Sequence, residues 1–183
     1  DAWPVRAAPF KMGEFDTVKL RSDIDREVAA GRLYQTQPGD HVEWSSPVFV
    51  VDDANKGVQG RLVCDYRRLN AVTRRNPYPL PLISTILRSF HDKSYFTTMD
   101  LVDGFFQVEL DPVAQNKAAI VTPFGVYKWR VLPLGVANGP PDFQQIMDFC
   151  KDKGLSPIDH ASAVHLGEDE TSDKWMNSDE PRR

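Results

Sequence analysis

The order of helix-like and strand-like segments constrains the fold of this 183-residue chain more than any single motif does. Residues 14–30 place apolar side chains at near-helical spacing, and Gly31 follows as a stop signal, which predicts an amphipathic helix. Residues 45–51 and 60–66 are rich in β-forming side chains and flank a turn-rich loop, so they predict a β-hairpin. The expected apolar face of the helix consists of Val18, Leu20, Ile24, Val28 and Ala29.

Alternating prolines interrupt the chain after this hairpin. Pro77, Pro79 and Pro81 predict an extended segment that leads into a short helix from about Ile83 to Phe90. Because helices and hairpins then follow without a regular βαβ alternation, the predicted fold class is α+β. The later elements that we expect are a buried strand at 95–101, two strands within 118–135 around the turn "TPFG", and a helix at 139–150.

Charge is distributed unevenly along the chain. Residues 1–147 carry 17 basic and 17 acidic side chains, whereas residues 148–183 carry five basic and nine acidic ones and show little periodicity. We therefore expect a domain at 1–147 and a divergent acidic tail at 148–183 that is mobile or ordered by a partner. The overall charge counts against a strong polynucleotide binder, because phosphate contacts need a basic excess. The local exception is a basic run, a candidate nucleic-acid surface, with Arg61, Arg67, Arg68, Arg74 and Arg75.

Several protein classes are disfavoured by composition. Cys64 and Cys150 are far apart in sequence and belong to no Cys/His cluster, which argues against a disulfide framework or a structural zinc site and favours an intracellular reducing compartment. No run approaches the roughly 20 apolar residues of a membrane span, so we expect none.

Two carboxylates lie near the end of the expected strand at 95–101, one within it and one after it. Asp100 stands at its end and Asp103 lies three residues later. A carboxylate held at the rim of a sheet can offer oxygen ligands to Mg²⁺, but an aspartate at such a junction can equally cap a helix. Phosphoryl transfer between nucleotides uses two metal ions, which require several converging carboxylates.

The chain resembles the reverse transcriptase of gypsy-type long-terminal-repeat retrotransposons. The matching blocks are "DREVAAGRL", "SSPVFVV", "RLVCDYRRLNAVTRRNPYPLP", "YFTTMDLVDGFFQVEL" and "KAAIVTPFGVYKWRVLPLGVANGPPDFQQIM", which follow the order and spacing of that family over residues 1–147. The resemblance implies a fingers subdomain followed by an incomplete palm with a ferredoxin-like core.

The resemblance also implies roles for individual residues. Asp100 matches the first metal-binding aspartate, and Asp103 a position whose backbone lies by the incoming triphosphate. Phe105 matches the aromatic gate that excludes a ribose 2′-OH, and Arg61 an arginine that would fork onto triphosphate oxygens. Gly135 and Gln144 fall in the block that shapes the nucleotide and template pocket.

Ordinary structural roles remain open for several of these residues. Phe105 and Phe106 are, by residue type, more often core than gate. Arg67 and Arg68 would also suit a solvated strand edge. Gly135 would equally suit an ordinary turn.

The sequence departs from the family in the residues that bind metal. The Tyr-Xaa-Asp-Asp block expected roughly 20 residues after "FQQIM" does not occur, and its nearest substitutes are Asp159 in "PIDH" and the pair Glu168 and Asp169. Asp100 alone cannot hold two Mg²⁺ ions. Other departures are Asp52 and Asp53 at usually basic positions, Leu134 at a commonly aromatic one, and Asp142, an acidic intrusion near the template side.

Three functions follow from these observations. The first is a catalytically inactive, retroelement-derived domain that serves as a structural subunit of a larger assembly, for example a ribonucleoprotein. The second is a fragment of an active, Mg²⁺-dependent RNA-directed DNA polymerase that uses an RNA or RNA/DNA template. The third is an RNA-binding remnant that uses Arg61 to Arg75. Without the hairpin that carries the Tyr-Xaa-Asp-Asp block in the family, apolar palm surface should be exposed unless the tail or a partner covers it.

Overall fold

A computed structural model describes residues 3–40, 42–51, 61–96 and 100–154. The fold is α+β, as the sequence predicted, and its core is a mixed sheet of five strands within the described residues. The elements in chain order are α1 (Glu14–Ala29), β1 (Leu33–Gln35), β2 (Ser46–Val51), β3 (Arg61–Cys64), α2 (Arg67–Val72), α3 (Ile83–Ser89), the 3₁₀-helix η1 (Gly104–Gln107), α4 (Pro112–Lys117), β4 (Ile120–Thr122), β5 (Gly125–Trp129) and α5 (Gly139–Asp152).

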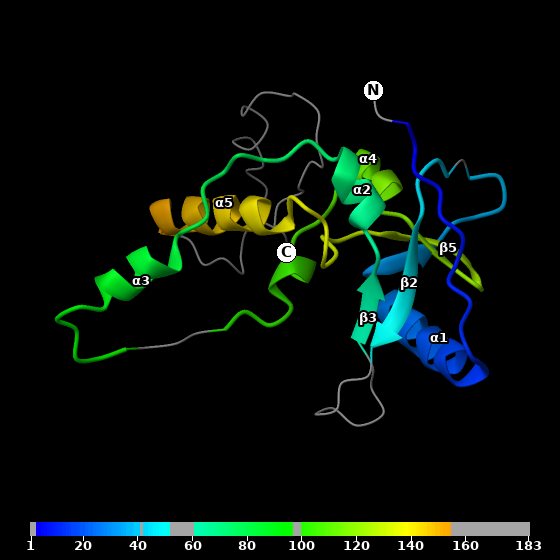
Figure 1. Ribbon diagram of the computed structural model, residues 1–183, viewed down its shortest axis with the longest axis horizontal. Coiled ribbons are helices and arrows are strands. Elements are labelled where there is room, and N and C mark those ends of the chain that lie inside the picture. Colours follow the sequence, from blue (N-terminus) through cyan, green and yellow to red (C-terminus); the bar gives the residue numbers. More distant parts are fainter. Residues whose placement is uncertain (1–2, 41, 52–60, 97–99, 155–183) are drawn as a thin grey trace, which may run out of the picture.

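The sheet joins the two predicted hairpins side by side. Its strand order is β1-β5-β4-β2-β3, and Figure 1 labels β5, β2 and β3 of this sheet. β2 and β3 pair antiparallel, as do β4 and β5, so both hairpin predictions are confirmed. The two hairpins meet through a parallel pairing of β2 with β4, in which Ser46 lies opposite Ile120.

Helix α1 covers the sheet and supplies part of the core. Leu20 and Ile24 are fully buried. The prediction was wrong for Val18, which is 65% exposed, for Val28, which is 39% exposed, and for Ala29, which is also exposed. The buried stripe runs at i, i+4 and i+7, and Glu27 takes the third position, where Arg32 pairs with it at 3.2 Å.

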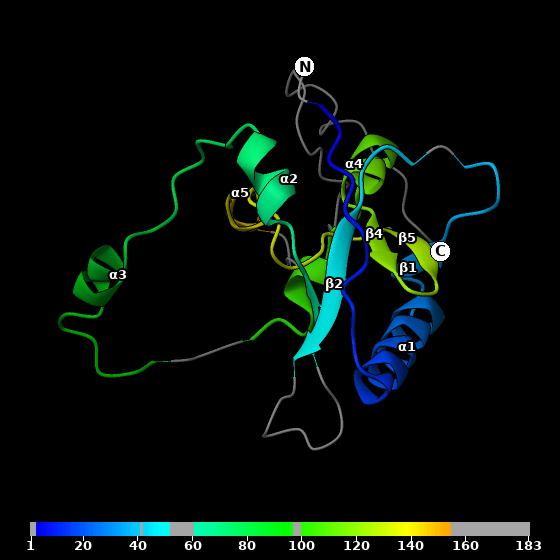
Figure 2. The same ribbon diagram turned by 45° about the vertical axis from the view of Figure 1, so that its right-hand side comes forward.

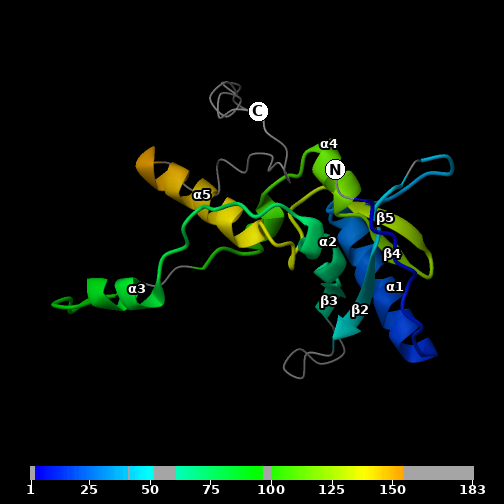
Figure 3. The same cartoon turned by 45° about the horizontal axis from the view of Figure 1, so that its top comes forward.

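The segment 79–96, which we call the arm, projects away from the sheet and carries α3. Figure 2 shows α3 at the far end of an open loop, and Figure 3 shows α3 and α5 projecting from the same side of the sheet. Every residue of the arm is exposed. Helix α3 forms as predicted, yet it buries none of its apolar side chains.

The described residues of the segment 95–101 do not form the predicted strand. Tyr95, Phe96, Asp100 and Leu101 have no strand conformation, and residues 97–99 lie outside the described residues. A strand needs a hydrogen-bonded neighbour, and the described residues of this segment pair with none of the five described strands. Tyr95 is 95% exposed and Phe96 is 61% exposed, so the expected exposure of apolar surface is confirmed here.

Some predictions fall on residues that the structure does not describe. These are the acidic substitution at Asp52 and Asp53, and the candidate carboxylates Asp159, Glu168 and Asp169 in the tail. Among the helices of the described residues, none has both the length and the apolar character needed to cross a membrane.

Candidate functional site

The turn that follows Asp100 has an unusual backbone. Asp103 adopts left-handed dihedral angles, φ 54° and ψ 36°, and directly precedes η1. Its carbonyl accepts a hydrogen bond of 2.7 Å from the Phe106 amide, which starts the 3₁₀ turn. A left-handed non-glycine residue costs about 1 kcal/mol. The neighbouring contacts of the turn must therefore offset this cost.

Arg32 supplies the most direct of these contacts. Its Nη2 donates to Oδ2 of Asp103 at 2.7 Å, across 71 residues of sequence. Its guanidinium also lies over the Phe106 ring, 4.8 Å from the centroid. Sequence reasoning missed Arg32, because nothing in its local pattern indicates a partner so far along the chain.

Phe105 and Phe106 hold the turn in place by packing against two different elements, α5 and β5. The Phe105 ring meets Phe143 of α5 edge to face at 5.0 Å, and the Phe106 ring stacks on Trp129 of β5 at 5.6 Å. Both phenylalanines are partly buried against the core. The packing role that was left open is therefore present for both rings, whereas the gate role of Phe105 stays a prediction.

Gly104 lies close to one of these rings. A Cβ on Gly104 would stand 3.2 Å from Cζ of Phe143, which is tighter than most real Cβ contacts. A side chain at position 104 would therefore require the Phe143 ring to shift by a few tenths of an ångström.

Gly135 lies in a loop that is held against the end of β3. Its φ is +97°, which glycine alone adopts without strain. Nδ2 of Asn70 donates to the Gly135 carbonyl at 2.9 Å, and Oδ1 of Asn70 accepts from the Ala137 amide at 2.8 Å. Gly135 is thus a turn glycine, and Asn70, which sequence reasoning missed, fixes its position.

A polar seam joins residues 74–78 to the start of α5. Asn138 donates to the Arg74 carbonyl at 2.9 Å and accepts from the Asn76 amide at 3.1 Å. Nδ2 of Asn76 donates to Oδ1 of Asp142 at 2.6 Å. These contacts fix the path of the chain that leads into the arm.

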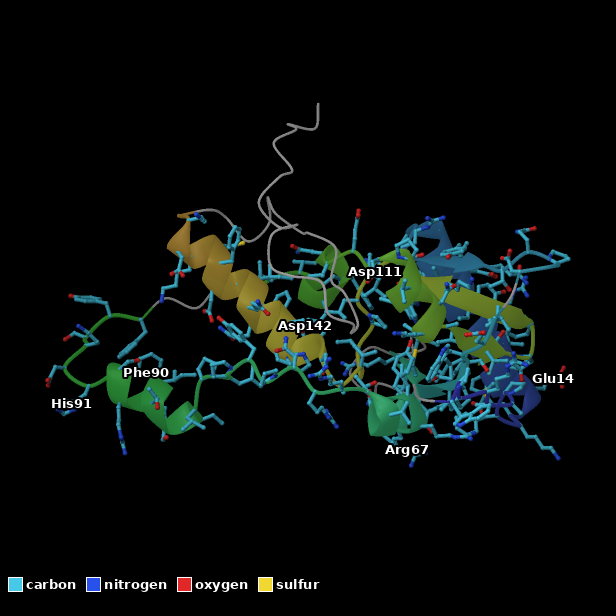
Figure 4. The ribbon with its side chains drawn as sticks, turned by 90° about the horizontal axis from the view of Figure 1, so that it is seen from above. Glu14, Arg67, Phe90, His91, Asp111 and Asp142 are labelled. Carbon is cyan, nitrogen blue, oxygen red and sulfur yellow. The ribbon has the colours of Figure 1, made fainter. Side chains whose placement is uncertain are left out.

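Asp142, the expected acidic intrusion, lies inside this seam at the start of α5, where Figure 4 labels it. It is 9% exposed, and its Oδ2 forms no hydrogen bond with any of the described residues. Burial raises the pKa of the Asp142 carboxyl from 3.8 to about 6, although the hydrogen bond from Asn76 opposes the rise. The carboxylate therefore packs the seam at an electrostatic cost.

Gln144 lies one residue beyond Phe143 on α5 and is partly buried. Its Nε2 donates to Oδ1 of Asp148 at 3.0 Å. The Tyr78 hydroxyl donates to the other oxygen of Asp148 at 2.8 Å, which ties the base of the arm to α5. The pocket role of Gln144 stays a prediction.

The basic run is spread over several structural elements. Arg61 begins β3, whereas Arg67 and Arg68 lie on α2, so the alternative of a solvated strand edge was wrong for them. Arg67 forms a bidentate pair with Asp65, with bonds of 2.8 and 2.7 Å, which lowers the pKa of the Asp65 carboxyl. The predicted nucleic-acid residues Arg68, Arg74 and Arg75 are also exposed.

Asp100 lies apart from the turn contacts and is exposed. Among the described residues, no three His, Cys, Asp or Glu side chains gather in a way that could hold a metal ion. The described residues therefore do not fit a two-Mg²⁺ centre, which needs several carboxylates around the ions.

Comparisons with known proteins converge on one family. A family model described as "Reverse transcriptase (RNA-dependent DNA polymerase)" matches residues 54–155. The Pol polyprotein from transposon gypsy of Drosophila melanogaster is 36% identical over 147 residues, which are 78% of this chain and 14% of that polyprotein. The putative enzymatic polyprotein of Cassava vein mosaic virus is 30% identical over 142 residues, 76% of this chain and 22% of its own length.

Solved structures support the fold independently. A foamy viral protease-reverse transcriptase in complex with an RNA/DNA hybrid aligns with a TM-score of 0.64 and 19% identity, covering 94% of this chain and 22% of the other. The native prototype foamy virus enzyme aligns with a TM-score of 0.65 and 24% identity, covering 83% and 20%. The chain thus spans less than a quarter of the length of each relative described here.

Proposed function

The chain belongs to the reverse transcriptase (RNA-dependent DNA polymerase) family, and we propose that its 183 residues form a catalytically inactive structural subunit of a larger assembly. Similarity to transposon Pol polyproteins gives the domain a retroelement ancestry. We assign residues 1–147 to fingers and partial palm, and residues 148–183 to a divergent acidic tail.

The observation that carries this proposal is the exposed arm. Soluble proteins rarely leave a contiguous apolar surface uncovered, and such a surface commonly marks an interface. The Tyr78–Asp148 bond fixes the base of the arm, so the surface is presented from a defined point. The exposed large apolar side chains of the arm are Leu80, Leu82, Ile83, Ile86, Leu87, Phe90, Tyr95 and Phe96.

The charges of the arm indicate the chemistry of the partner. Arg88 and Lys93 are exposed among the apolar residues, and the surface is hollowed next to Phe90 and His91, which Figure 4 shows at the end of α3. Asp92 is the sole acidic residue of the arm. A protein surface with apolar side chains and an acidic rim complements this pattern.

Inactivity of the separate chain follows from the metal chemistry. Asp100 is exposed, and among the described residues it belongs to no group of three ligating side chains, whereas two-metal phosphoryl transfer needs several carboxylates that converge. Within an assembly that supplied further ligands, Asp100 would offer one carboxylate to Mg²⁺. The residues that we assign to the nucleotide side of such a site are Arg61, Asp103, Phe105, Gly135 and Gln144.

Nucleic-acid binding is the second candidate function. The exposed arginines Arg68, Arg74 and Arg75 favour it, and structural neighbours were solved with an RNA/DNA hybrid and with double-stranded DNA. The pairing of Arg67 with Asp65 weakens the basic surface. Binding of this kind should fall steeply with salt concentration and weaken in the double variant Arg68→Ala and Arg74→Ala.

Association measurements test the main proposal. The purified chain should bind a hydrophobic dye and self-associate in sedimentation, and the variant Ile83→Asp with Leu87→Asp should lose both properties. In its source cells the wild-type chain should co-purify stoichiometrically with defined subunits, and the variant should not. Val113→Asp is the control, because Val113 is 59% exposed on α4, outside the arm. A monodisperse wild-type monomer that binds no dye would contradict the proposal.

A further inference from the structure

Hydrogen bonds with Glu27 and Arg130 hold the backbone and part of the side chain of Arg32 in place. Its backbone amide donates to the Glu27 carbonyl at 3.0 Å, and its backbone carbonyl accepts from the Arg130 amide at 2.8 Å. Its Nη1 donates to Oε2 of Glu27 at 3.2 Å, and the Glu27 side chain is buried. One donor group of the guanidinium, Nη2, is thereby directed outward from a fixed base.

The outward group meets the turn at its strained residue. Nη2 lies 2.7 Å from Oδ2 of Asp103, the left-handed residue that starts η1. The same guanidinium covers one face of Phe106, whose ring stacks on Trp129. Arg32 therefore contacts both the first residue of the turn and the ring that anchors its middle.

We propose that Arg32 is a positioning residue, which holds Asp103 in its left-handed conformation and thereby fixes where Phe105 presents its ring. The physical step is short, because the Asp103 carbonyl accepts the Phe106 amide and the Phe105 carbonyl accepts the Val108 amide. Release of the Asp103 side chain frees the backbone that these bonds require.

The inference deepens one part of the proposed function, the assignment of Asp103 and Phe105 to the nucleotide side of a site that an assembly would complete, and it rests on that assignment in one respect, namely that the Asp103–Gln107 turn faces a nucleotide there. If it does, Arg32 sets the steric selection at the sugar without touching substrate, and α1 is coupled to the pocket through the end of its last turn. The inference itself concerns one conformational coupling and can be tested in the isolated chain with no nucleotide present.

The test is a double-mutant cycle read by amide hydrogen exchange at Phe106. Arg32→Ala and Asp103→Asn should each raise the exchange rate about threefold, the size expected for a partly exposed ion pair. Asparagine tolerates the left-handed region, so Asp103→Asn removes the charge and leaves the backbone preference nearly unchanged. The double variant should exchange no faster than Arg32→Ala alone, because that change already removes the interaction with Asp103.

Ring signals of Phe105 provide a second measurement. The edge-on Phe143 ring should shift them in the wild type, and Arg32→Ala should move them toward random-coil values. Arg32→Lys should restore part of the shift. Arg130→Ala is the matched control, since its guanidinium lies over Tyr34 at 4.5 Å. The amide of Ala118, hydrogen-bonded to the Ala114 carbonyl, should exchange at the wild-type rate throughout.

Two outcomes would overturn the inference. Unchanged exchange at Phe106 in Asp103→Asn would show that the ion pair does not hold the turn, and this variant leaves α1 intact. Additive effects of Arg32→Ala and Asp103→Asn would show that Arg32 does not act on the turn through Asp103. Neither outcome bears on association through the arm, so failure of this inference and failure of the proposed function are distinguishable.

Discussion

The amide of Asn70 binds the loop around Gly135 with both of its polar atoms. Nδ2 donates to the Gly135 carbonyl at 2.9 Å, and Oδ1 accepts from the Ala137 amide at 2.8 Å. Asn70 belongs to α2, directly after the β2–β3 hairpin, whereas Gly135 leads into α5. One side chain thus connects the hairpin side of the molecule to the helix that carries Phe143.

The first prediction concerns this connection. Asn70→Asp keeps the acceptor for Ala137 and loses the donor to Gly135, whereas Asn70→Ala loses both. We expect the free energy of unfolding to fall by about 1 kcal/mol for Asn70→Asp and by about 2 kcal/mol for Asn70→Ala. Urea denaturation measures both values. Asn116→Ala, at an exposed position of α4, should change stability little, and equal losses in all three variants would contradict the account.

The second prediction concerns Phe143 and its helix neighbour. Phe143→Ala removes the ring that packs against Phe105 and should lower the free energy of unfolding by about 2 to 3 kcal/mol. Phe149→Ala makes the same chemical change on the same helix at a residue that is 44% exposed, so it should cost far less. Thermal or urea unfolding of the pair distinguishes a core contact from a general effect on α5.

The third prediction concerns pH. Burial raises the pKa of Asp142 to about 6, so the folded chain binds this proton more tightly than the unfolded chain does. The destabilising contribution of Asp142 is absent below pH 3.8 and complete above about pH 6, and stability falls between these values as pH rises. Other carboxyls also titrate in this range, so the relevant quantity is the difference between wild type and a variant.

Asp142→Asn gives that difference. The variant should be more stable than the wild type by about 1 kcal/mol at pH 7, and the gap should close as the pH is lowered to 4. Denaturation curves at several pH values measure it. A gap that is constant with pH would show that the Asp142 carboxyl does not titrate differently in the folded chain.

The fourth prediction concerns the start of α4. Oδ1 of Asp111 accepts from the amides of Val113 and Ala114, at 2.8 and 3.1 Å, which is the arrangement of an N-terminal cap. Asp111→Ala should lower the free energy of unfolding by about 1 kcal/mol, and Asp111→Asn by less, because an amide oxygen can still accept both bonds. Equal losses for the two variants would argue against the capping role.

Local sequence patterns predicted most elements of this fold. The helix at α1, both hairpins and α5 depend on periodicity and turn residues within a few positions, and the chain adopts them. The strand prediction for 95–101 was wrong because a strand depends on a paired neighbour, which no local pattern supplies. The predicted burial of Val18 was wrong because helical spacing alone does not decide which of two adjacent stripes faces the sheet.

The site was less predictable than the fold. Family resemblance proposed Asp103 and Phe105 as site residues, and that assignment stays a prediction, whereas their contact partners Arg32 and Phe143 were not predicted. Arg32 and Asp103 are 71 residues apart, and Asn70 and Gly135 are 65 residues apart. Contacts of this range join separate elements and leave no periodicity in the sequence, so they emerge only from the folded arrangement.

Primer extension tests the central claim most directly. The purified 183-residue chain would be mixed with Mg²⁺, a primed RNA template and deoxynucleotides, with Asp100→Asn as the matched control. We predict no extension above the level of Asp100→Asn, because two metal ions need several converging carboxylates and the described residues hold no such group. Robust extension by the wild-type chain that Asp100→Asn abolishes would contradict the proposed inactivity.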